Sequence, residues 1–164
     1  MNESLVEALG PPPFRFTPSR GPTMHSRAFS PCFKLLATAL ALGLAYWFIV
    51  LWLDGKVAGG AVSIMSWFMA ALAMTLYTWW HILRSVTSLD SSQLQQTWVW
   101  PKKMELRELA YGKLIRVRGL EWLIAPRLYV RTLLGKFAVF YAADPAMIAE
   151  FERLVAELKD FRGL

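Results

Sequence analysis

The sequence has few of the residues on which metal binding and catalysis depend. It contains one cysteine and two histidines among 164 residues. A lone cysteine cannot form an intrachain disulfide, so nothing indicates an oxidising compartment. The chain has no HExxH motif, no paired cysteines, no P-loop and no GxGxxG or GxSxG motif. We therefore expect a protein that is not an enzyme and that holds neither a metal nor a cofactor.

Charged residues are also scarce, at 18% of the chain, against roughly 25% in ordinary soluble domains. Two segments, Leu35–Leu53 and Gly59–Leu83, contain no Asp, Glu, Lys or Arg. As helices both are about long enough to cross the roughly 30 Å hydrocarbon core of a bilayer. A buried hairpin in a soluble protein is the alternative, but so short a chain leaves no outer layer to cover two such helices. Residues 35–83 therefore predict a transmembrane hairpin whose connector is Asp54–Ala58.

The basic residues predict the orientation of this hairpin. They cluster in the 34 residues before the first segment and again from Arg84 onward, whereas the connector holds only Lys56. Because Lys and Arg are enriched in cytoplasmic loops, we expect both termini of the chain in the cytoplasm. Aromatic rings and a basic residue at the span ends are expected to anchor it at the interface: Trp52, Tyr77, Trp79, Trp80 and Arg84.

The interior of the hairpin predicts packing rather than transport. Neither segment has an ionisable residue in its middle, which argues against a transporter or channel. Small residues recur every four positions at Ala37, Ala41 and Ala45 in the first segment and at Ser66 and Ala70 in the second. Such stripes let helix backbones approach closely, so we expect them to form the seam of the hairpin. A seam between copies of the chain, giving a homo-oligomer, is the alternative.

The first 34 residues differ in composition from the rest. They contain six prolines interleaved with Gly, Ser and Arg. This composition predicts a mostly disordered cytoplasmic tail, residues 1–34.

Residues 84–164 form the expected cytoplasmic domain. Apolar and polar residues alternate there in short runs broken by Gly and Pro, a pattern typical of β-strands. Gly135 suits the positive φ of a tight turn between the last two strands. The expected strands cover residues 94–100, 113–124, 127–132 and 136–142, and residues 104–109 form a further element of open type.

A closing helix is predicted over residues 145–160. Asp144 and Pro145 are typical of a helix start, because Asp accepts hydrogen bonds from free amides and Pro loses nothing at the first helical position. The apolar stripe that marks its buried face consists of Ile148, Phe151, Leu154, Val155 and Leu158. The strands and this helix together predict a small α+β domain, a β-sheet closed by one amphipathic helix.

This order of elements resembles a bacterial family in which two transmembrane helices precede a pleckstrin-homology-like (PH-like) domain on the cytoplasmic side. The resemblance implies that the hairpin lies in a bacterial inner (plasma) membrane. The resemblance covers residues 33–161, and its best local features are the run RGLEWLIAPRLYVRTLLGKFAVFYAADP and the helix after Asp144. A complete domain of that family has more strands than this sequence predicts. A shortened variant or a different small sheet-and-helix fold therefore stays open. Small two-span membrane toxins with a β-rich tail have a similar layout.

Alternation within the predicted strands places basic residues on an exposed sheet face. If a strand buries Ile115 and Val117, its arginines point to the opposite side. The basic residues assigned in this way are Arg116, Arg118, Arg127 and Arg131, with Lys102 and Lys103 added to the patch. Anionic lipid headgroups or a partner could meet this face, and a solvated strand face is the plainer interpretation. No motif supports nucleic-acid binding.

These observations favour a membrane-anchored interaction domain. The leading hypothesis is an assembly or regulatory factor for a membrane complex, which binds a protein partner through its cytoplasmic domain. The alternatives are a domain that senses anionic lipids through the arginine face and a membrane-tethered, toxin-like regulator of a cytosolic target.

Overall fold

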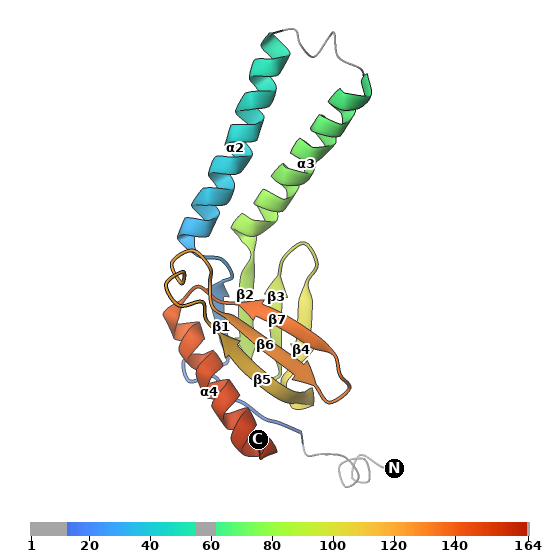
Figure 1. Ribbon diagram of the computed structural model, residues 1–164. Coiled ribbons are helices and arrows are strands. Elements are labelled where there is room, and N and C mark those ends of the chain that lie inside the picture. The colour runs from blue at the N-terminus through green and yellow to red at the C-terminus, as the bar shows by residue number, and fades with distance from the viewer. Residues whose placement is uncertain (1–12, 55–61, 164) are drawn as a thin grey trace.

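A computed structural model describes residues 13–54 and 62–163 of the chain. A pair of long helices projects from one end of a β-rich domain, and the last helix lies along one side of that domain (Figure 1). The elements follow one another in the order β1 (Thr23–Arg27), α2 (Pro31–Leu53), α3 (Val62–Arg84), β2 (Val86–Asp90), β3 (Gln93–Thr97), β4 (Lys102–Glu105), a 3₁₀ turn (Leu106–Glu108), β5 (Leu109–Ile115), β6 (Arg127–Thr132), β7 (Phe137–Tyr141) and α4 (Pro145–Arg162).

The strands form two antiparallel sheets. The first has the order β1-β2-β3-β4 and the second the order β5-β6-β7. Buried and accessible residues alternate along β1, β2 and β3, as expected for strands with one face on a core. Buried polar side chains join the sheets: the Thr87 hydroxyl donates to the Tyr141 carbonyl, and the Gln96 side-chain oxygen accepts from the Tyr141 backbone N–H at 3.4 Å. One core therefore lies between the two sheets.

The expected disordered tail is wrong for residues 13–34. Its residues Thr23–Arg27 form β1, which pairs along its whole length with β2. Phe14 and Phe16 are buried in the core, together with Met24 of β1. A proline-rich composition disfavours a helix, but an extended chain with prolines can still place every second apolar side chain in a core. The domain therefore begins before the hairpin, and residues 84–164 are only part of it. Residues 1–12 of the expected tail lie outside the described residues.

The long helices α2 and α3 contact each other through aromatic and polar side chains. The rings of Phe48 and Phe68 stack with centroids 5.7 Å apart, and the Trp79 indole donates to the Thr38 hydroxyl at 2.9 Å. Ala41 is buried, which agrees with the expected seam on α2. On α3 the expected seam is not matched at Ala70, which is exposed, and the stacking contact with α2 is made by Phe68.

One helix among the described residues, α2, is long and apolar enough to cross a membrane by length and composition. Few of its residues are buried within the structure. By the same criterion of length and composition, α3 is not a candidate membrane span. Positions 59–61 of the expected second span lie outside the described residues. The second half of α3, which contains several aromatic residues and two threonines and ends at Arg84, lowers the apolar character of this helix.

The C-terminal hairpin and helix agree with the sequence. Strands β6 and β7 pair in the expected place, and Gly135 in their turn has a positive φ of 82°. Helix α4 buries Phe151, Leu154 and Leu158 against the sheets. Gly112 of β5 permits this approach, because a Cβ there would lie 3.3 Å from Val155 Cγ2.

Three strand assignments need correction. The expected strand 113–124 ends at Ile115, because the chain turns at Gly119, whose φ is 83°. The expected strand 94–100 ends at Thr97. Strand β2 was missed, since VTSLD has only two strongly apolar residues and directly follows the apolar helix.

Candidate binding surfaces

The four arginines assigned to one face lie in two places. Arg127 and Arg131 are on β6, on the side of the sheet that faces away from the core. Arg116 and Arg118 follow β5 in the long connection to β6, where strand alternation no longer applies. Arg116 forms an ion pair with Glu152 of α4. The expectation of a single four-arginine sheet face is therefore wrong, because β5 is shorter than the sequence pattern indicates.

Arg116 and Arg118 line a groove of about 690 Å³ between the β5–β6 connection and α4. Its other charged lining residues are Lys113, Glu121, Glu152 and Lys159. The groove thus contains four basic and two acidic side chains, and one basic group, Arg116, is already paired. The paired carboxylate offsets part of the positive charge that an anionic ligand would meet.

The outward side of β5-β6-β7 combines aromatic and basic side chains; we call it the outer face. The register places Tyr111 and Phe137 on either side of Arg131, and Lys113 and Val139 on either side of Tyr129. The rings form a row, with Tyr111 and Tyr129 centroids 6.4 Å apart and Tyr129 and Phe137 centroids 6.2 Å apart. The Phe137 side chain is 69% exposed. Helix α4 packs against β5, and within the described residues Tyr111, Lys113, Arg131 and Phe137 are exposed, so this part of the outer face is accessible to solvent.

Lys102 and Lys103 begin β4 and border the outer face rather than the arginine groove. The Lys102 ammonium donates to the Val139 carbonyl of β7 at 3.3 Å and lies 5.5 Å from the Trp98 ring centroid. Lys103 is exposed. Of the predicted basic residues, Arg127 and Arg131 thus lie on β6, Lys102 and Lys103 line a hollow beside the β6–β7 turn, and Arg116 and Arg118 belong to the groove.

The base of the helix pair is fastened to the domain by named contacts. The Ser30 hydroxyl caps α2 by accepting from the Phe33 N–H at 3.1 Å and donates to the Leu123 carbonyl at 2.7 Å. The Lys34 ammonium donates to the Leu83 carbonyl at 2.8 Å, which ties α2 to the end of α3. Phe29 packs between helix and sheet, with its ring 5.3 Å from Phe33 and 5.7 Å from Tyr141.

The expected interface anchors lie at both ends of the helices. Trp52 is exposed near the end of α2, and Tyr77 and Trp80 are exposed near the end of α3. The Arg84 guanidinium lies over the Trp80 ring, 3.9 Å from its centroid. Trp79 differs from the others because its indole N–H is used in the contact with Thr38 of α2.

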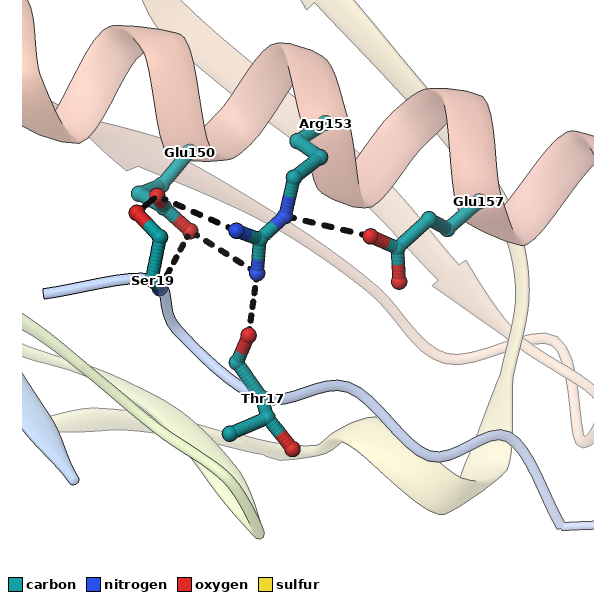
Figure 2. A network of polar contacts seen from close by, with 5 residues as sticks. All are labelled: Thr17, Ser19, Glu150, Arg153 and Glu157. Carbon is teal, nitrogen blue, oxygen red and sulfur yellow. Dashed lines mark hydrogen bonds and ion pairs between the residues drawn. The ribbon is translucent and has the colours of Figure 1, made fainter. Parts of the chain in front are cut away.

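A polar network that the sequence did not reveal fastens the N-terminal segment to α4 (Figure 2). The buried Glu150 carboxylate accepts from the Ser19 backbone N–H at 3.3 Å and from the Ser19 hydroxyl. Arg153 pairs with Glu150 at 3.2 Å and with Glu157 at 3.1 Å, and also donates to the Thr17 carbonyl. Glu150 lies outside the apolar stripe predicted for α4, and no sequence signal marks its partner in the tail.

Comparison with known proteins adds no relationship: no family model, no curated protein and no solved structure matches this chain. Within residues 13–54 and 62–163, no group of His, Cys, Asp or Glu is arranged to hold a metal ion.

Proposed function

We propose that this protein is a membrane-anchored, non-enzymatic binding module that serves as an assembly or regulatory factor for a membrane complex. Its anchor is the α2–α3 hairpin, with both helices crossing a bacterial inner membrane and both termini in the cytoplasm. Its binding part is a PH-like domain, assembled from residues on both sides of the hairpin, which presents the outer face to a protein partner.

The arrangement of strands supports the PH-like assignment. Two antiparallel sheets of four and three strands share one core, and a C-terminal amphipathic helix packs beside β5. The chain departs from an uninterrupted domain of this kind because the connection between β1 and β2 consists of the helix pair. Because the helix pair lies between β1 and β2, the sequence after α3 contains only part of the first sheet.

The exposure of the helix pair supports its place in a membrane. Large apolar side chains of α2 and α3 are exposed along both helices, among them Leu35, Leu53, Trp67 and Met74. Contiguous apolar surface of this kind is unfavourable in water and favourable in hydrocarbon. The Arg84–Trp80 pair at the end of α3 is of the type that lies at headgroup level.

The open outer face is the single observation on which the binding role depends. Aromatic side chains combined with arginine are enriched where proteins bind one another, and the three rings and Arg131 are adjacent here. The basic residues Lys113, Arg127 and Arg131 favour a partner with an acidic surface.

A crosslinking experiment in cells tests this role. A photoreactive phenylalanine at position 137 in the full chain should yield one discrete crosslinked protein, and the same residue at Arg107 should not. The variant Arg131→Glu should lose the crosslink, because this exposed side chain lies between Tyr111 and Phe137 in the register of the sheet. Lys159→Glu, an exposed substitution in the groove, is the matched control and should retain it. Equal crosslinking from positions 137 and 107 would contradict a binding role for the outer face.

A further inference from the structure

Two connections of the domain lie at the same end as the helix pair. The Cα register pairs Arg27 with Val86 and Val86 with Thr97, so the turn after β3 starts directly below α3. The Ser85 hydroxyl donates to the Thr97 carbonyl at this point. On the other side, the Ser30–Leu123 hydrogen bond holds the β5–β6 connection against the start of α2. Figure 1 shows these loops on either side of the helix bases.

Both connections carry tryptophans that the domain does not cover. Trp100, in the turn between β3 and β4, is 74% exposed, and Trp122, in the β5–β6 connection, is 61% exposed. Leu120 is also exposed beside Trp122. By contrast, Trp98 in the same turn packs edge-on against Phe29, with centroids 6.4 Å apart. The chain thus orders one tryptophan against the helix base and leaves two others pointing outward at the same end.

The charge at this end suits an anionic surface. Arg84 closes α3, Lys102 and Lys103 follow Trp100, and Arg116 and Arg118 precede Trp122. The acidic side chain next to the second tryptophan is Glu121, and Glu152 is occupied by Arg116. Tryptophan favours the boundary between headgroups and hydrocarbon, and Lys and Arg near it gain from anionic lipids.

We infer that the β3–β4 turn and the β5–β6 connection dock on the headgroup layer of the membrane that the hairpin crosses, with Trp100 and Trp122 as the anchors. This inference rests on the proposed membrane hairpin. The helix base and the two tryptophans provide three points of contact, which fix the tilt of the domain on the membrane. A fixed tilt would hold the outer face in one orientation toward a neighbouring membrane complex.

Fluorescence quenching in vesicles tests the docking. The full chain with Cys32→Ser is reconstituted in vesicles of phosphatidylcholine and phosphatidylglycerol, and one cysteine at a time carries an environment-sensitive dye. Pro101→Cys and Glu121→Cys place the dye beside the tryptophans and leave both rings in the chain. Leu134→Cys is the matched control, since Leu134 is 77% exposed and belongs to the β6–β7 turn, which lies away from the helix base (Figure 1). Leu42→Cys reports on the middle of α2.

Dyes at positions 101 and 121 should show blue-shifted emission and quenching by lipids that carry a spin label on the headgroup, whereas the dye at position 134 should show neither. Trp100→Ser combined with Trp122→Ser should abolish the shift at 101 and 121. Emission at 101 and 121 that matches position 134, or that is unchanged by the double substitution, would overturn the docking and indicate solvent or a protein partner there. A dye at position 42 that resists quenching by acyl-chain spin labels would overturn the membrane hairpin itself, which separates the two failures.

Discussion

Ala28, just before the helix pair, donates its backbone N–H to the carbonyl oxygen of Ser85, just after it, at 3.2 Å. The neighbouring residues Arg27 and Val86 are cross-strand partners in the first sheet. The two strands therefore meet as a β-hairpin whose connection has been replaced by α2 and α3. Everything on the chain before α2 that packs in the core belongs to the same folding unit as the residues after α3.

The hairpin should be removable without loss of the domain. A chain in which residues 13–28 are joined to residues 85–163 by Asn-Gly should fold as a soluble monomer, because a two-residue turn connects adjacent antiparallel strands. Heteronuclear NMR and size-exclusion chromatography measure the outcome.

The control is the fragment 84–164, which lacks β1, Phe14 and Phe16. It should expose the β2 edge and part of the core, and therefore aggregate or fail to give dispersed spectra. A well-folded 84–164 fragment would show that β1 and the segment before it are dispensable.

Both ends of the helix pair should lie on one side of the membrane. Strands β1 and β2 pair directly, so the residues before α2 and after α3 cannot be separated by a bilayer. Reporter fusions at the two termini should both indicate the cytoplasm, in agreement with the basic residues around the helices. A fusion after Asp54 should report the opposite side. Reporters that place the C-terminus outside would contradict the orientation.

The apolar face of α4 should dominate domain stability. Phe151→Ala in the hairpin-free chain should lower the free energy of unfolding by about 3 to 5 kcal/mol, because a buried ring leaves a cavity that neighbours fill only in part. Phe137→Ala is the matched control at an exposed position and should change stability by no more than about 0.5 kcal/mol. Chemical denaturation monitored by circular dichroism gives both values. Similar losses for the two variants would mean that α4 does not cover the core in solution.

The carboxylate of Glu150 should hold the N-terminal segment on α4. Glu150→Ala leaves the Ser19 N–H and hydroxyl without their acceptor and should cost about 1 to 3 kcal/mol. Glu157→Ala removes the more exposed partner of Arg153 and should cost less than about 1 kcal/mol.

Limited proteolysis provides a second measurement for these variants. The segment that includes Arg15 and Arg20 should be cleaved faster by trypsin in Glu150→Ala than in Glu157→Ala, since loss of the Ser19 contacts frees the backbone. Equal cleavage rates would show that Phe14 and Phe16 alone fasten the segment.

Three elements of the fold could be predicted from patterns among residues that are close in the sequence. The long apolar run up to Leu53 specified α2, and Asp144-Pro145 with the stripe through Phe151 and Leu158 specified α4. Gly135 between two alternating runs specified the β6–β7 turn. In each case the pattern that predicts the element lies within a short, continuous stretch of sequence, so it can be recognised without knowledge of distant contacts.

The sequence also identified the basic residues of the candidate surfaces, but not how they are grouped. Alternation correctly placed Arg127 and Arg131 on the outer side of β6. It failed for Arg116 and Arg118, because β5 ends at Ile115 and the following residues turn toward α4. Where a strand ends depends on the partner strand with which it pairs, which adjacent residues do not reveal.

The sequence by itself determined an apolar α2, a closing helix and a β-rich C-terminal part, because each depends on periodicity along a short stretch of chain. Only the tertiary structure decided that Thr23–Arg27 is a strand of the same sheet and that Phe14 and Phe16 belong to its core. It also decided that Asp144, read as a local helix cap, accepts from the Arg27 backbone N–H of β1 at 3.2 Å instead. These contacts join residues on opposite sides of the helix pair, and burial of a side chain or pairing of a strand edge is favourable only once the distant partner is in place.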